Sequence, residues 1–192
     1  MRIAFGLSNT LADIEESGFD FTFKLRPGAF DLVQILKQQG HVLILWTSKK
    51  RSSFSSIKRK SEDFFNLFDE TYCKEDFELM QEIPGCSYHM FKDINRINAD
   101  CLIESKDSYK KYAKILNLTD KYLIIDKYRE FLLNKPAQWQ IKMVGPGIVE
   151  KREKRRQQKE DWVIDVFEYA EKLNKDLSSA NLVIDSLCDK AT

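Results

Sequence analysis

The sequence predicts a doubly wound α/β protein, with a mostly parallel sheet flanked by helices in the manner of a Rossmann-type core. Apolar, strand-like segments alternate with amphipathic, helix-like segments along roughly the first 145 residues. One of these segments, HVLILWTS at residues 41–48, is almost continuously apolar, which is typical of a central parallel strand buried on both faces. Hydrophobic residues make up 43% of the 192-residue chain, enough to form a sizeable core.

The first elements follow from local patterns. Residues 2–8 alternate large apolar and small side chains, and Asn9 then marks a turn, which predicts a short buried strand. Phe19, Phe21 and Phe23 alternate with polar neighbours, so we expect a hairpin flap over 12–25 with one apolar face. A helix is expected to begin at Pro27, where a missing N–H costs least, and to end near Gly40.

The middle of the chain is less regular. A helix is expected from about Ser53 to Leu67, and residues 69–105, which include Pro84 and Gly85, are interpreted as an insertion with a small sheet of its own. The remaining elements expected in the core are a helix over 105–119, a strand over 121–126, a short helix over 127–133 and a last strand over 138–144.

The composition changes near residue 146. A densely charged run, EKREKRRQQKED, leads into an amphipathic helix from Trp162 to Leu173, and ANLVIDSL at 180–187 is a candidate second helix. We therefore expect a core domain at 1–145, with a flap at 12–25 and a small insertion at 69–105. A helical extension at 146–192 is expected to pack on the core or to form an interface, including one between two copies of the chain.

The bulk numbers exclude some classes of function. The 31 basic and 30 acidic residues give a net charge of +1, which argues against capture of nucleic acid or an anionic membrane by the molecule as a whole. No apolar run is long enough to span a bilayer, the N-terminus lacks the pattern of a signal peptide, and the four cysteines are scattered. These features predict a cytoplasmic protein.

Polar residues follow three of the predicted strands. Ser8 to Thr10 end the first, Thr47 and Ser48 end the second, and Asp126 ends the third. In open α/β sheets, ligands bind in the crevice beyond the carboxyl ends of the strands. The sequence therefore predicts one site at this edge of the sheet.

Several stretches in this order resemble the haloacid dehalogenase (HAD-like) superfamily, in particular its NIF-like phosphatases of the carboxy-terminal-domain type. The stretches are IAFGLSNTL at 3–11, LRPGAFDLVQILKQQGHVLILWTSKKR at 25–51, SKDSYKKYAKIL at 105–116 and YLIIDKYREF at 122–131. Together the resemblance covers about residues 1–145.

In that family, the first motif supplies two aspartates two residues apart. The first attacks the phosphoryl group and holds Mg²⁺, and the second acts as general acid and base. The resemblance places Gly6 and Ser8 at these positions. Glycine has no side chain to phosphorylate and serine is no carboxylic acid, so the resemblance implies a degenerate active site without catalytic residues, metal ligands or cofactor.

Other parts of the family's site have counterparts here. The resemblance matches Thr47, with Ser48 beside it, to a phosphate-binding hydroxyl, Lys106 to the third-motif lysine, with Lys92 as the alternative, and Asp126 to an acidic metal ligand. Lys127 follows Asp126 where a second acidic residue is common. Two structural interpretations stay open, since Thr47 and Ser48 are also suited to cap the next helix, and Asp126 to cap a turn. The candidate ligand-binding residues are Thr10, Thr47, Ser48, Lys106 and Asp126, and we expect the cleft to retain weak affinity for phosphate or sulfate.

The function that follows is that of a pseudophosphatase, which binds an unidentified protein partner or a phosphorylated ligand. One alternative is an active, Mg²⁺-dependent phosphatase with a non-standard first motif, in which Asp13, Glu15 or Glu16 replaces the nucleophile. Another is a nucleic-acid-associated adaptor that uses the basic clusters at 49–60 and 151–159, although nucleic acid is the less favoured partner and a membrane is not expected.

Overall fold

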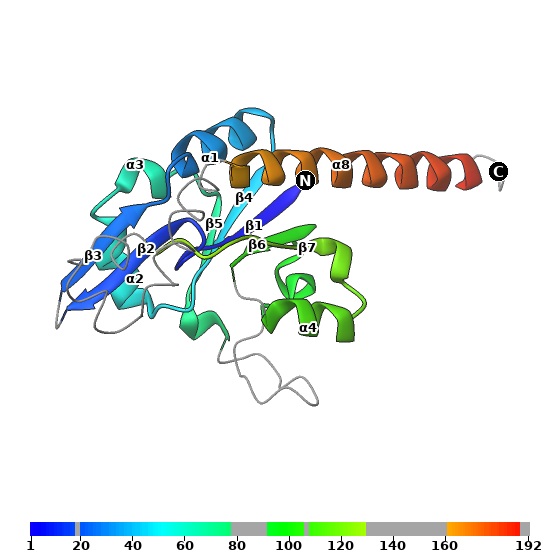
Figure 1. The fold of residues 1–192 in the computed structure, drawn as a ribbon. Coiled ribbons are helices and arrows are strands. Elements are labelled where there is room, and N and C mark those ends of the chain that lie inside the picture. Colours follow the sequence, from blue (N-terminus) through cyan, green and yellow to red (C-terminus); the bar gives the residue numbers. More distant parts are fainter. Residues whose placement is uncertain (18–19, 78–91, 106–107, 130–160, 189–192) are drawn as a thin grey trace, which may run out of the picture.

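A parallel sheet forms the centre of the molecule in the computed structural model, which describes residues 1–17, 20–77, 92–105, 108–129 and 161–188 (Figure 1). Its strands are all parallel and their spatial order is β5-β4-β1-β6-β7. The strands are β1 (Arg2–Gly6), β4 (Val42–Trp46), β5 (Glu70–Tyr72), β6 (Cys101–Glu104) and β7 (Tyr122–Ile124). The predicted fold class is confirmed.

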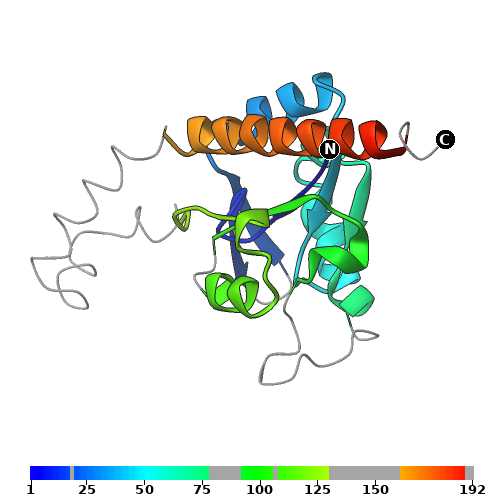
Figure 2. The ribbon, with the colours of Figure 1, turned by 90° about the vertical axis from the view of Figure 1, so that its right-hand side faces the viewer.

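Helices cover both faces of this sheet, because alternate residues of each strand point to opposite sides. Ile3 and Phe5 of β1 pack into one apolar cluster with α1 (Ala29–Gln38) and α8 (Asp161–Cys188). Ala4, between them, packs into a second cluster with α4 (Ser108–Ile115). Figure 2 shows α1 and α8 on one side of the sheet and α4 on the other.

The expected flap is an antiparallel hairpin of β2 (Ala12–Ser17) and β3 (Asp20–Leu25). It packs on the neighbouring helices rather than projecting freely. The rings of Phe23 and Phe65 lie 5.5 Å apart, and Lys60 forms an ion pair of 3.0 Å with Asp20 near the tip. Aromatic packing therefore holds the hairpin on the body of the molecule.

The helix expected over 53–67 is divided in two, α2 (Arg51–Lys58) and α3 (Glu62–Phe65). The turn between them changes the direction of the chain, so that Phe54 and Phe65 meet edge to face at 5.4 Å. A single straight helix would separate these rings by three turns. Three short 3₁₀ turns complete the described elements: η1 (Lys74–Phe77), η2 (Ile94–Ile97) and η3 (Thr119–Lys121).

The region 69–105 differs most from the expectation of an insertion with its own sheet. Its described strands β5 and β6 belong to the main sheet, and β6 lies directly beside β1. These strands are only three and four residues long, so their sequence pattern does not distinguish a central strand from a peripheral one. Of the short helix expected at 127–133, residues 127–129 are not helical, and the strand expected at 138–144 lies outside the described residues.

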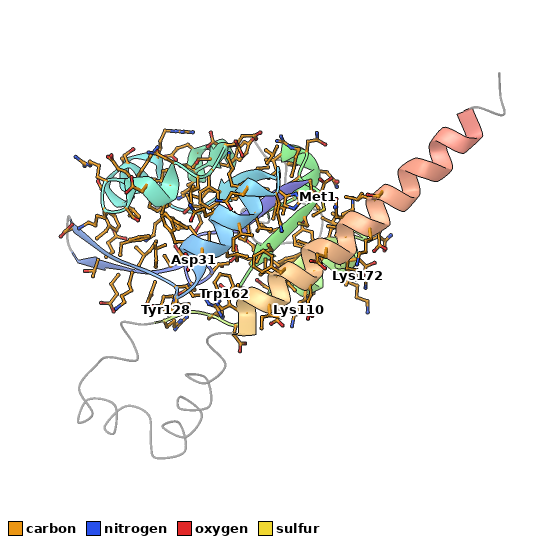
Figure 3. All side chains as sticks on the ribbon, turned by 90° about the horizontal axis from the view of Figure 1, so that it is seen from above. Met1, Asp31, Lys110, Tyr128, Trp162 and Lys172 are labelled. Atoms are coloured by element: carbon orange, nitrogen blue, oxygen red, sulfur yellow. The ribbon has the colours of Figure 1, made fainter. Side chains whose placement is uncertain are left out.

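One continuous helix, α8, replaces the two expected at the C-terminus. Its first half packs on the core through Trp162, Val166 and Ala170, whereas its C-terminal half extends past the sheet (Figures 1 and 3). Trp162 Nε1 donates a hydrogen bond of 3.1 Å to the carbonyl of Pro27, and the Arg26 guanidinium lies 4.4 Å from the centroid of its ring. The first turn of α8 is therefore anchored beside the start of α1.

Arg26 is almost fully buried at this anchor. Burial lowers its pKa to about 10, although the nearby charges of Asp126 and Asp165 oppose the shift, so the guanidinium stays charged at neutral pH. Its Nη1 donates a hydrogen bond of 2.8 Å to the carbonyl oxygen of Asp126. The anchor thus connects the flap, the segment after β7 and α8.

Replacing Trp162 by alanine should lower the free energy of unfolding by about 3–5 kcal/mol, because the indole is 2% exposed and its removal leaves a cavity. Ile164→Ala is the matched control on the same helix, since Ile164 is 57% exposed and its loss should change stability by less than about 0.5 kcal/mol. Denaturant titration followed by circular dichroism measures both. Equal effects of the two substitutions would show that this face of α8 is not anchored.

Candidate functional site

The candidate site lies where β1, β4 and β6 end side by side. In the register of the sheet, Gly6 is paired with Trp46 of β4, and Phe5 is paired with Ile103 of β6. Gly6 and Glu104 therefore follow neighbouring positions on adjacent strands. Because side chains alternate between the two faces along a strand, positions 6 and 104 face the same side of the sheet as Ala4 and Leu102.

The Glu104 carboxylate fills the space that a side chain at position 6 would occupy. A Cβ built on Gly6 would lie 2.6 Å from Glu104 Oε1 and closer still to its Oε2, and real Cβ atoms do not approach other atoms so closely. Glu104 is itself 2% exposed, and its carboxylate could withdraw only by breaking the hydrogen bonds that hold it. Glycine at position 6 and a long acidic side chain at position 104 are therefore a matched pair.

Both carboxylate oxygens have hydrogen-bond donors. Lys92 Nζ lies 2.5 Å from Oε2 and also donates to the carbonyl of Trp46 at 2.6 Å. The Thr10 hydroxyl donates to Oε1 at 2.7 Å, and the backbone amide of Ser105 donates to the same oxygen at 2.9 Å. All of these groups are buried, so the cluster is a neutral ion pair with its hydrogen bonds satisfied.

The electrostatics of the pocket keep Glu104 ionised. Burial acts to raise the pKa of its carboxyl, but the Lys92 ammonium, the Ser105 amide and the Thr10 hydroxyl together outweigh burial and lower it below its ordinary value. The ammonium that could otherwise hold an external anion is thus paired with an internal one.

Several backbone amides around the pocket are also engaged internally. In the turn after β1, the amides of Thr10, Leu11 and Ala12 all point to the carbonyl of Leu7, at 3.1–3.3 Å. Asn9 makes this turn possible with a left-handed φ of 62°. Such a turn presents its amides to its own carbonyl rather than to a phosphate.

A backbone amide at the end of β4 is also hydrogen-bonded within the protein. The amide of Thr47 donates to the carbonyl of Tyr72 at 2.9 Å, and the Thr47 hydroxyl accepts from the amide of Lys49 at 3.1 Å. Thr47 is buried, and its hydroxyl stabilises the turn that precedes α2. It does not cap that helix, because the N-cap residue is Lys50 and has no side-chain capping bond. Ser48 is half-buried beside it.

The structure brings some of the predicted residues together and separates others. Gly6 and Thr10 border the pocket, and the hydroxyl of Ser8 is buried with no hydrogen-bond partner in the described part of the chain. Asp126 is exposed and follows β7, which β6 separates from β1. Lys106 lies outside the described residues.

Of the two candidate lysines, Lys92 is the one that the described structure places in the pocket, although the sequence-based ranking put Lys106 first. Glu104 was missed. The sequence contains a signal for it, because CLIE at 101–104 is a short apolar segment that ends in an acidic residue, as the predicted strand ending at Asp126 does. Assigning 69–105 to an insertion removed this segment from consideration as a central strand.

The described residues of this pocket do not fit a magnesium ion. Mg²⁺ prefers several oxygen ligands in octahedral geometry, whereas here Gly6 provides none and the Glu104 oxygens face an ammonium, a hydroxyl and an amide. Within the residues that the structure describes, no group of three or more His, Cys, Asp or Glu side chains is placed to hold a metal ion. Of the proposed substitute nucleophiles, Asp13 is buried on β2, while Glu15 and Glu16 are exposed.

The chain is thus a doubly wound α/β protein with a polar pocket at its strand ends, and the charged groups of that pocket pair with each other. Neither the protein-family models nor the curated proteins compared with the sequence give a match. Solved structures do show similarity in fold.

One is the fission yeast RNA polymerase II CTD phosphatase Fcp1 bound to beryllium fluoride, at 13% identity and a TM-score of 0.49, covering 69% of this chain and 43% of that one. Another is a chain of the Pnkp1/Rnl/Hen1 complex, at 14% identity and a TM-score of 0.47, covering 68% and 47%. A further crystal structure has 15% identity and a TM-score of 0.46 over 96% of each chain. The chain thus spans less than half the length of each of the first two structures.

Gly6→Ala should destabilise the protein by about 1–3 kcal/mol, because the new methyl group overlaps the Glu104 carboxylate in a filled pocket. The control is the same change in a Lys92→Ala, Glu104→Ala background, which removes the obstructing carboxylate together with its counter-charge. There the change should be neutral or stabilising by up to about 1 kcal/mol. Equal costs in the two backgrounds, measured by denaturant unfolding, would contradict this arrangement.

The pairing of Glu104 should also appear in the pH dependence of stability. Because the pKa of Glu104 is lowered in the folded state, its contribution is complete above the ordinary glutamate value of 4.5 and is lost as pH falls below that value. At pH 7, Glu104→Gln should cost about 3–5 kcal/mol, since it leaves a buried ammonium unpaired. The stability difference between the native chain and this variant should shrink as the pH is lowered from about 6 to about 3, and a constant difference would exclude the pairing.

Proposed function

We propose that this chain is a catalytically degenerate HAD-like protein, a pseudophosphatase that acts as a binding or regulatory module for a protein partner. The observation that carries the proposal is the placement of the Glu104 carboxylate over Gly6. The position that the family resemblance assigns to the nucleophile has no side chain, and its space is filled from the neighbouring strand.

The remaining chemistry of the pocket supports the same conclusion. Phosphoryl transfer of this type needs a nucleophile, a general acid and a cation to neutralise charge in the transition state. Ser8 is not a carboxylic acid, and Lys92 is already neutralised by Glu104. None of these residues can therefore supply the nucleophile, the general acid or the free positive charge that the reaction needs.

An active phosphatase with a non-standard nucleophile is the second candidate, and the position of Glu104 is the observation in its favour. Its carboxylate is ionised and lies beside Gly6, so it is the acidic group that the structure brings to the expected nucleophile position. Against this role, both of its oxygens accept hydrogen bonds and the whole residue is 2% exposed. A substrate phosphate would have to displace Thr10 or Lys92 to reach it.

The nucleic-acid adaptor has less support from the basic cluster at 49–60. Lys49 pairs with Glu16, Arg51 pairs with Asp76 and Lys60 pairs with Asp20. Cations that are partly neutralised by neighbouring carboxylates attract phosphates less strongly than a free basic stripe would. The second cluster, at 151–159, lies outside the described residues.

The proposal also concerns the binding partner of the chain and its location in the cell. A protein partner is favoured over a phosphorylated ligand because Lys92 and the backbone amides of Thr10, Leu11, Ala12 and Thr47 already have partners within the protein. We keep the cytoplasm as the expected location and a second copy of the chain, bound through α8, as one candidate partner. Across the described residues, none of the helices has the length and apolar character needed to cross a membrane.

The native chain should not hydrolyse an aryl phosphate above the uncatalysed rate, with or without added Mg²⁺, because the described residues offer no accessible nucleophile in the pocket. Release of the aryl alcohol, measured from mildly acidic to mildly basic pH with and without a chelator, tests this expectation. Turnover that Mg²⁺ sustains and chelation abolishes would contradict the proposal. If that turnover also disappeared in Glu104→Gln but not in Asp13→Asn, Glu104 would be the nucleophile.

A further inference from the structure

The polar groups around Glu104 have the composition of an oxyanion-binding site. Lys92 contributes a positive charge, Thr10 a hydroxyl donor and Ser105 a backbone amide, and these donors converge on one carboxylate. Three donors of different types around two oxygens is an arrangement that proteins use to bind small carboxylate and phosphate ligands.

The carboxylate reaches this site from a neighbouring strand, and its approach depends on the missing side chain of Gly6. Glu104 extends across the end of β1, while Lys92 is positioned by a second hydrogen bond to the carbonyl of Trp46 on β4. The donors are therefore held by β1, β4 and β6 independently of the carboxylate that they bind.

We propose that the strand-end pocket is a preformed site for a small carboxylate-like anion and that Glu104 is its permanent, intramolecular ligand. The inference rests on the proposed loss of catalysis, because a working phosphatase has to admit an external phosphate here. It also changes the expectation drawn from the sequence: the native chain does not bind phosphate or sulfate in this pocket, since the charge and the hydrogen-bond donors are already occupied.

A variant without the internal ligand provides the test. Glu104→Ala removes a CH₂ and a carboxylate, and acetate contains the same arrangement of atoms. If the donors stay in place, acetate should bind in the resulting cavity and stabilise the variant. At a concentration about ten times its dissociation constant, acetate should raise the unfolding midpoint by about 3 °C relative to chloride at equal ionic strength.

Two controls separate this effect from general stabilisation by salt. Glu104→Gln keeps the pocket filled, and Lys92→Ala combined with Glu104→Ala removes the positive charge, so neither should respond to acetate beyond its response to chloride. If Glu104→Ala does not fold in chloride, acetate should restore its folding, as measured by circular dichroism and refolding yield.

The proposal is overturned if Glu104→Ala shows no specific response to acetate, if it stays unfolded in acetate, or if either control responds equally. It is also overturned if the native chain binds inorganic phosphate in calorimetric titration and Lys92→Ala abolishes that binding. Binding of phosphate without turnover would leave the proposed non-catalytic function standing. Turnover by the native chain would exclude both the proposed non-catalytic function and the permanently occupied pocket.

Discussion

The buried pair of Lys92 and Glu104 is the constraint on which the rest of this site depends. An ammonium enclosed at the ends of three strands needs a negative charge within contact distance, because an unpaired buried charge is strongly destabilising. The Glu104 carboxylate supplies that charge at 2.5 Å, and the geometry leaves no space for a Cβ at Gly6. The absence of a side chain at position 6 is therefore part of the packing of this core.

Thr10 connects the pocket to the periphery of the molecule. Its hydroxyl binds Glu104, while its carbonyl lies 3.5 Å from Arg26 Nη1. Arg26 in turn stacks on Trp162 and binds the carbonyl of Asp126. The flap, the segment after β7 and the first turn of α8 thus meet on the turn that follows β1. A continuous series of contacts therefore joins the first turn of α8 to the pocket.

Local patterns in the sequence were sufficient for the fold class, the flap and the anchoring face of α8, because each depends on periodicity within a short segment. Glu104 depends instead on which strand lies beside β1. That pairing joins residues almost a hundred positions apart, and β6 is only four residues long, so its apolar run carries little information. The sequence showed that Gly6 lacks a reactive group, but only the register of the sheet shows what fills the space.

The same register determines what the substitution Gly6→Asp would meet in the pocket. The introduced carboxylate and that of Glu104 would both face the single ammonium of Lys92, in a space that does not accommodate even a methyl group. Like charges in contact raise each other's pKa and oppose joint burial. The acidic group of this pocket can therefore come from β1 or from β6, but not from both. The pairing of Glu104 with Lys92 leaves this pocket neutral, and an acidic side chain on β1 would fit only beside a smaller, uncharged residue at position 104.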